Sequence, residues 1–210
     1  GRGGTQYVYR TADYSSDTVA IQAANDALID FRRDVLFFTP GAYSLAAAVT
    51  VDVPDARWLG RPVASPYQAA ASITDAIGSG LAVGAAADRM EFAFLRFVPL
   101  TATAIFTYAD GANAPYFHHF YYNADGITAD TATQFMVAAG AMNGALFEDF
   151  VFHTDGAQGP MFELDGTVES AVFRNFIHHH NGGTLAISLL DIDGAGATGI
   201  VVGPGHGQCG

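Results

Sequence analysis

The sequence predicts an all-β fold, a short right-handed single-stranded parallel β-helix closed at its N-terminal end by an amphipathic α-helix. Three observations predict it. A helical apolar pattern follows residue 16, short apolar strands follow residue 35, and aromatic pairs return every 23 to 30 residues. Stacked units of that length bury a continuous core that no single unit could bury alone.

The composition fits one domain built as a solenoid. Half of the 210 residues are hydrophobic, and no apolar run reaches the 18 or more residues that a transmembrane helix needs, so we expect no membrane partner. Twenty-one Asp and Glu against nine Arg, with no Lys, give a net charge of −12. That charge repels phosphate backbones and argues against a nucleic-acid partner. Acidic polysaccharide would need clustered Arg or a bridging cation.

The N-terminal end is expected to contain an arm and a helix. Residues 1–16 are polar and without a clear period, which predicts an extended arm that could dock on a neighbouring chain. Residues 17–33 are expected to form the capping helix. Asp17 favours the positive end of its dipole, and Arg32 and Arg33 favour the other end. Its apolar residues recur at steps of three and four: Val19, Ile21, Ala24, Leu28, Ile29 and Phe31.

Residues 35–200 are expected to form the coils. Residues 35–38 are a fully apolar run rich in strand formers, residues 39–41 form a Thr-Pro-Gly turn, and a second strand is expected near residues 48–51. Residues 201–210 are Gly-rich and predict an extended tail. A metal site at His206 and Cys209 in that tail is the less favoured interpretation.

Residues 16–27 and 35–45 resemble the opening of the pectate-lyase-like (pectin lyase fold) β-helix superfamily. In that family an Asp-Thr-x-Ala-Ile-Gln-Ala-Ala helix caps the solenoid, and a Val-x-Phe-x-Pro-Gly-x-Tyr segment begins the first coil. The resemblance covers residues 16–60. Because pectate and pectin lyases, polygalacturonases, phage tailspikes and other virion proteins share it, the resemblance implies a fold and no particular substrate.

A repeated Phe-x-x-Phe motif supports the same fold independently. The last three copies each end in Asp-Gly or Asn-Gly, dipeptides suited to turns with positive φ, and each is followed by a second strand. A β-sandwich would not place the same motif at coil-length intervals, and a leucine-rich repeat would show denser Leu periodicity. The copies are Phe94/Phe97, Phe117/Phe120, Phe147/Phe150 and Phe173/Phe176.

Stacking these copies in register predicts polar ladders along one edge of the rod. One interpretation is a catalytic or metal site built from Asp125, Asp155, His153 and His179, with Ca²⁺ held by the carboxylates. The other, which we favour, is that the ladders hydrogen-bond turn backbones and each other. The predicted ladders are Asn123, His153 and His179; Asp125, Asp155 and Asn181; and His118-His119, Glu148-Asp149 and Arg174-Asn175.

No catalytic, metal or cofactor residues are therefore assigned from the sequence. In the run His178-His179-His180, side chains of an extended strand alternate faces, so only two could converge on a metal. Lyases of the resembling family use Ca²⁺-binding carboxylates and an Arg or Lys base on one strand face. Here Arg96 and Arg174 lie about three coils, or roughly 14 Å, apart and cannot act on one bond.

The leading expectation for function is a non-catalytic structural protein, a phage virion component such as a capsid decoration, cement or tail-associated protein, located in the virion. Its expected partners are other virion proteins and copies of itself, as in a homotrimer. The alternative is an extracellular polysaccharide lyase or glycoside hydrolase acting through Asp125, Asp155 and His153, and glycan binding without turnover stays open. Candidate interface aromatics are Tyr7, Tyr9, Tyr14, Tyr116, Tyr121 and Tyr122.

Overall fold

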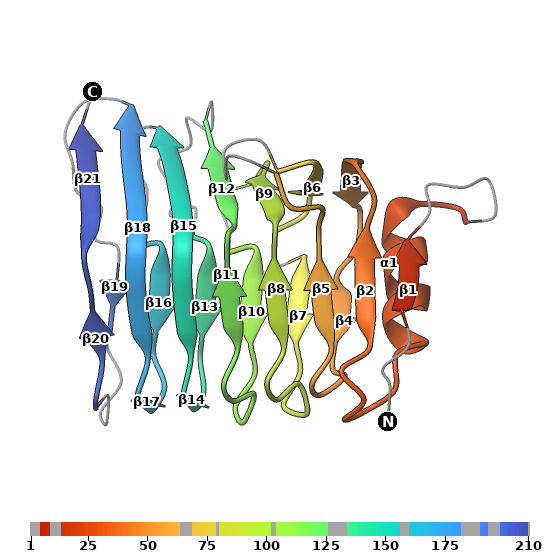
Figure 1. Ribbon diagram of the computed structural model, residues 1–210, viewed down its shortest axis with the longest axis horizontal. Coiled ribbons are helices and arrows are strands. Elements are labelled where there is room, and N and C mark those ends of the chain that lie inside the picture. The colour runs from red at the N-terminus through yellow and green to blue at the C-terminus, as the bar shows by residue number, and fades with distance from the viewer. Residues whose placement is uncertain are drawn as a thin grey trace.

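The computed structural model describes residues 5–8, 14–63, 69–78, 80–101, 104–125, 134–155, 160–181, 190–192 and 198–209. Within these residues the chain forms a parallel β-solenoid of about five turns with one short helix near its N-terminus (Figure 1). The predicted all-β parallel β-helix with an N-terminal helix is confirmed.

The strands form a large front sheet, a back sheet and a two-stranded ribbon, and the strand pairings are parallel throughout the described residues. The lower arm of the front sheet holds β1 (Thr5–Val8), β2 (Val35–Phe38), β5 (Arg57–Leu59), β8 (Glu91–Ala93), β11 (Tyr116–His118) and β20 (Val201–Val202). The upper arm holds β3 (Gly41–Leu45), β6 (Ala71–Asp75), β9 (Leu95–Pro99), β12 (Tyr121–Ala124) and β21 (Gly205–Cys209). Two long strands, β15 (Leu146–Asp155) and β18 (Val172–Asn181), run through both arms.

The back sheet closes each coil behind the front sheet (Figure 1). Its strands are β4 (Val49–Val51), β7 (Leu81–Val83), β10 (Phe106–Tyr108), β13 (Met136–Ala138), β16 (Phe162–Leu164) and β19 (Leu190–Asp191). The two-stranded ribbon is β14 (Met142–Asn143) with β17 (Val168–Glu169).

The capping helix α1 (Asp17–Asp26) is shorter than the predicted 17–33. Its N-cap is Ser16, whose hydroxyl accepts a hydrogen bond from the backbone N–H of Val19. Beyond the helix the chain turns, and Phe31 has a left-handed φ of 58°, which a helix cannot continue through. The buried Ile21 faces the core, and Asn25 donates to the carbonyl of Thr50 on β4 at 3.0 Å. The helix therefore closes the N-terminal end of the core.

Both segments that the sequence placed outside the coils include strands of the front sheet. In the expected arm, β1 pairs with β2, and in the expected tail, β20 and β21 pair with β18. The glycine content of the tail suits this role, because a Cβ on Gly205 would collide with the ring of Phe176 in the layer beneath. A Gly-rich composition therefore marks close backbone approach here and not a free tail.

Buried aromatic rings stack in columns along the rod. Ring centroids lie 4.6 Å apart for Phe92 and Phe117, 5.2 Å for Phe117 and Phe147, and 4.8 Å for Phe147 and Phe173, with planes within 15° of parallel. This confirms the stacking of the last three Phe-x-x-Phe copies. The first copy was misaligned by two residues, because Phe92, and not Phe94, pairs with Phe117.

Two columns of left-handed residues form corners of the coil. From β2 onward, one lies two residues before the start of each strand of the lower arm, β15 and β18 included, and the other lies between the arms of the front sheet, where Phe94 occupies a corner. Since L-residues other than Gly, Asn and Asp seldom adopt this conformation, the coil dictates it. The columns are Arg33, Asp55, Arg89, Ala114, Gly144, Ser170 and Gly199, and then Phe94, His119, Asp149 and Asn175.

Phe147 sits between two stacked rings, so its removal should cost more stability than the removal of an unstacked core residue. We expect Phe147→Ala to lower the free energy of unfolding by about 3–5 kcal/mol, through lost burial and a cavity. Phe147→Leu, which keeps most of the volume, should cost roughly 1–2 kcal/mol. Chemical denaturation followed by circular dichroism measures both, and equal losses would contradict the stacked column.

Candidate functional site

The predicted ladder of Asn123, His153 and His179 is present on the upper arm of the front sheet. Asn123 pairs in register with His153, and His153 pairs with His179. The neighbouring residues Tyr122 and Phe152 are fully buried, so strand alternation places the ladder on the outer face. The register prediction for these three residues is confirmed.

His153 and Asp125 form the centre of a polar cluster, which we call the upper cluster. His153 Nδ1 lies 3.0 Å from Asp125 Oδ2 and 3.1 Å from the hydroxyl of Tyr121. With the Asn123 amide oriented to satisfy its neighbours, its oxygen accepts from Arg96 Nη2 at 2.7 Å and its nitrogen donates to Asp125 Oδ2 at 3.1 Å. Five side chains from three layers therefore contact one another.

The two other predicted members are Asp155 and His179. The backbone of Asp155 ends β15 and pairs with Asn181, but the side chains of both residues lie outside the described part of the chain. His179 contacts His153 at 5.9 Å between ring centroids. Among the described residues, no group of three or more His, Cys, Asp or Glu is arranged to hold a metal ion.

Arg96 and Tyr121 are the members that sequence reasoning missed. They pair in register, and the Arg96 guanidinium lies 5.3 Å from the centre of the Tyr121 ring. The signal that could have found them is their shared position two residues after the corner residues Phe94 and His119. The misaligned first Phe-x-x-Phe copy concealed it.

The upper cluster has the components of proton transfer but limited access. An imidazole beside a carboxylate and a phenol can accept and return a proton. The side chain of His153 is 24% exposed and that of Asp125 is 39% exposed, whereas Tyr121 is buried at 6%. A ligand could therefore reach the imidazole and the carboxylate more readily than the phenol.

A second cluster, the lower cluster, surrounds Glu91 on β8. Arg57 donates two hydrogen bonds to its carboxylate, at 2.6 and 2.8 Å, and His118 Nε2 lies 3.1 Å from it. Burial alone would raise the pKa of Glu91, but the hydrogen bonds from His118 and Arg57 outweigh burial and lower it to about 2. Glu91 is therefore a carboxylate held ionised within its own sheet.

Glu148 extends the lower cluster to the next two layers of the front sheet, β15 and β18. Arg174 Nε donates to Glu148 at 2.7 Å, and the hydroxyl of Tyr116 donates to the same carboxylate. Burial would raise the pKa of Glu148, but these hydrogen bonds lower it. Burial and the Glu148 contact both raise the pKa of Tyr116, so this phenol stays protonated. The predicted ladder of His118, Glu148 and Arg174 is confirmed by the strand register.

These ion pairs share one geometry, in that they join successive layers of the solenoid. Arg57 to Glu91, His118 to Glu91, His153 to Asp125 and Arg174 to Glu148 each connect neighbouring coils. In the described residues the exceptions are a local contact of Arg32 with Asp34 and a longer contact of Arg33 with Glu91. Two further pairs between neighbouring coils are Asp55 with Arg89 and His119 with Asp149.

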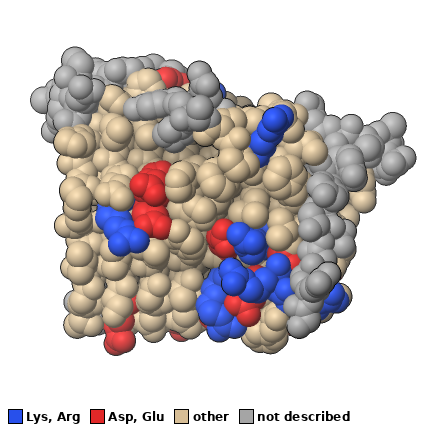
Figure 2. Space-filling view, in the orientation of Figure 1, with Lys and Arg blue, Asp and Glu red and all other residues tan. Residues whose placement is uncertain are grey.

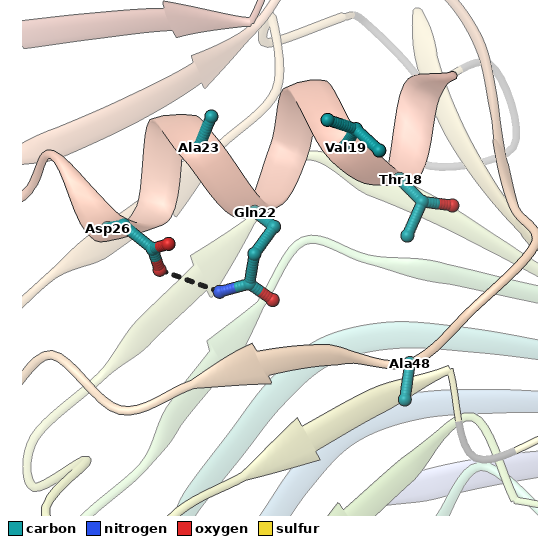
Figure 3. Close-up of a pocket in the computed structure, with 6 residues that line it drawn as sticks. All are labelled: Thr18, Val19, Gln22, Ala23, Asp26 and Ala48. Carbon is teal, nitrogen blue, oxygen red and sulfur yellow. Dashed lines mark hydrogen bonds between the residues drawn. The ribbon is translucent and has the colours of Figure 1, made fainter. Parts of the chain in front are cut away.

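Two hollows in the described surface lie away from both clusters. One, of about 340 Å³, lies between α1 and the start of β4, where Asp26 accepts a hydrogen bond from Gln22 Nε2 at 2.7 Å (Figure 3). Another, of about 300 Å³, lies over the back sheet between Thr50 and Ala109. Both are shallow and mainly apolar. The first is lined by Thr18, Val19, Gln22, Ala23, Asp26 and Ala48.

Comparison with known proteins adds no family. No family model matches the chain, and neither the curated proteins nor the solved structures contain a match. The structure alone shows the parallel β-solenoid. Membership of the pectate-lyase-like superfamily is therefore a proposal. No helix in the described residues is long and apolar enough to cross a membrane.

The lowered pKa of Glu91 predicts an acid-dependent loss of stability. Its folded-state pKa of about 2 lies below the ordinary 4.5, so the carboxylate stabilises the fold above about pH 4.5, and that contribution is lost as pH falls toward 2. Glu91→Gln should lower stability at pH 7 by roughly 1–2 kcal/mol, because Arg57 and His118 lose a charged partner. It should also flatten the decline between pH 4.5 and 2.

Urea denaturation at several pH values measures this effect. Glu169→Gln, which removes one carboxylate at an exposed position of β17, is the matched control. A Glu91→Gln variant with the same pH profile as the wild type would contradict the assignment.

Proposed function

We propose that this protein is a non-catalytic structural building block of the virion type, a capsid decoration or tail-associated component of a phage. The observation that supports the proposal is the pairing of charged outer side chains between successive layers. Residues that could have carried chemistry, such as Glu91 and Glu148, are held by Arg and Tyr partners of the same chain. The carboxylates of Glu91 and Glu148 form ion pairs that join neighbouring coils.

Such pairing suits a stiff, long-lived element. A single exposed ion pair contributes about 0.2–1 kcal/mol, but two-point Arg–carboxylate contacts in a partly buried network contribute more and fix geometry. Arg57 with Glu91 is a partly buried contact of this two-point kind, and Arg89 with Asp55 has the same two-point geometry at an exposed position. Combined with stacked rings inside, they resist sliding of one coil over another.

The proposed partners are other virion proteins and copies of this chain, including a homotrimer, with the virion as location. Among the candidate interface aromatics, Tyr121 and Tyr122 are buried at 6% and 0%, so they do not furnish an interface. Tyr14 is 42% exposed and is available to a partner. Tyr116 is half-buried and donates to Glu148, and the side chains of Tyr7 and Tyr9 lie outside the described part of the chain.

The alternative proposal is a polysaccharide lyase acting at the upper cluster. The specific observation that favours it is the 3.0 Å contact of His153 with Asp125. Arg96 belongs to the same cluster because Asn123 contacts both Arg96 and Asp125. A lyase needs a base, an acid and a cation to neutralise a uronate, and His153, Tyr121 and Arg96 are of those types. A glycoside hydrolase needs two carboxylates at a set separation, and Asp125 is the carboxylate that the described part of this cluster provides.

Assays of the purified protein on acidic and neutral glycans, with and without Ca²⁺, distinguish the two proposals. For a structural protein we expect no product, and Asp125→Asn should reduce stability by roughly 0.5–1 kcal/mol through the lost contact with His153. The matched control is Asp149→Asn, which affects the looser pair of His119 and Asp149 at 3.7 Å. Turnover that disappears in Asp125→Asn and His153→Ala but persists in Asp149→Asn would replace the structural proposal with the lyase.

A further inference from the structure

His118 and His119 bring two imidazole nitrogens together at the lower cluster. Their Nδ1 atoms lie 2.9 Å apart, and the two rings are nearly perpendicular, at 85°. Adjacent side chains of an extended strand would point to opposite faces of the sheet. His119, however, occupies a corner between the arms of the front sheet, with a left-handed φ of 51°. The corner therefore allows two consecutive histidines to meet on one side of the sheet.

The other nitrogen of each imidazole faces a carboxylate. His118 Nε2 lies 3.1 Å from Glu91 Oε1, and His119 Nε2 lies 3.7 Å from Asp149 Oδ2. The Glu91 carboxylate already accepts two hydrogen bonds from Arg57 and offers only acceptors, so the His118 proton belongs on Nε2. Asp149 attracts a proton to Nε2 of His119 in the same way. Because a neutral imidazole carries one proton, each Nδ1 then has a lone pair.

Two lone pairs at this distance repel each other unless they share a cation, either a proton or a metal ion. A carboxylate behind the imidazole is the usual arrangement at metal-binding histidines, where it fixes the tautomer and raises the basicity of the ligating nitrogen. The separation fits a metal as well. At a metal–nitrogen distance of about 2.0–2.1 Å, ligands at a right angle lie about 2.9 Å apart, whereas a tetrahedral angle needs about 3.3 Å. Right angles are typical of Ni²⁺ and Cu²⁺.

Neighbouring side chains hold both imidazoles in place. Tyr116 stacks on His118 with ring centroids 4.3 Å apart, and Phe94 of the preceding coil packs against the two imidazoles at 5.5 and 5.1 Å. The side chain of His118 is 12% exposed and that of His119 is 50% exposed. Figure 2 shows two groups of charged side chains on the front face with uncharged surface between them, and β11 lies between β8 and β15. The pair is therefore ordered and also open to a dissolved ion.

We propose that His118 and His119 bind a divalent transition metal that prefers tetragonal geometry, Ni²⁺ or Cu²⁺, through their two Nδ1 atoms. Water completes the coordination, since the described residues place no third His, Cys, Asp or Glu at the pair. The ion replaces a repulsion by a bridge and ties the end of β11 to the corner that follows it. This binding goes beyond the proposed structural role, which stands whether or not the metal binds.

Isothermal titration calorimetry of the full chain with Ni²⁺ alone tests the proposal. Ni²⁺ is the probe because, unlike Cu²⁺, it does not oxidise the thiol of Cys209. We expect saturable binding whose affinity falls at least about tenfold in His118→Ala and in His119→Asn, because a two-point contact becomes a one-point contact. The preceding coil has Ala93 at the position of His118, so His118→Ala should fold. A later coil has Asn175 at the corner of His119, so His119→Asn should fold as well.

The matched control is His206→Ala, which removes an exposed imidazole of β21 and should leave the affinity unchanged. Nuclear magnetic resonance locates the ion, because paramagnetic Ni²⁺ broadens the signals of nearby rings. We expect the ring signals of Tyr116 and Phe94 to broaden together with those of His118 and His119. Broadening that spares His118 and His119 would overturn the proposal, as would binding that neither variant weakens. Absence of Ni²⁺ binding would overturn it too and would leave a proton as the shared cation.

Discussion

Every feature of this protein depends on the in-register stacking of buried rings between neighbouring coils. Parallel strands repeat at about 4.8 Å, and the ring columns repeat at nearly the same distance. Stacked aromatic pairs contribute about 0.5–1.5 kcal/mol beyond the area they bury. Because Phe117, Phe147 and Phe173 occupy one column, a shift of one residue in any coil would remove a ring from the core and expose it.

The same register governs the outer face. Each outward side chain lies beside its counterpart in the next coil, so like charges in one column would repel and opposite charges attract. In the front sheet, Arg57 lies beside Glu91 and Glu148 lies beside Arg174, so neighbouring charges are opposite in sign. A hydrophobic requirement inside the rod has therefore determined which charges can stand outside it.

The sequence predicted the features that repeat and missed those that depend on exact register. The aligned copies around Phe117, Phe147 and Phe173 are sufficient to predict that Asn123 lies beside His153. Phe94 was aligned with Phe117 in error because Phe92 and Phe94 are both phenylalanines two residues apart. Only the strand pairing shows that Phe92 lies in the core and Phe94 at a corner. For the same reason Arg96, although considered as a possible base, was not placed beside Tyr121. The strand β21 was missed because a backbone-paired strand needs no apolar alternation when glycine permits close approach. The strand β1 was missed because residues 1–16 show no clear period.

The left-handed corners have a consequence for how such a chain can change length. From Arg33 to Gly199 the corner residues recur at spacings of 22 to 34 residues, yet the same conformation returns in every coil. The added residues lie between strands, as in the long connection from β5 to β6. Insertions can therefore accumulate in such connections while the corners and the core stay fixed. A scaffold of this kind can acquire a new peptide segment, whether by evolution or by engineering, without a new fold.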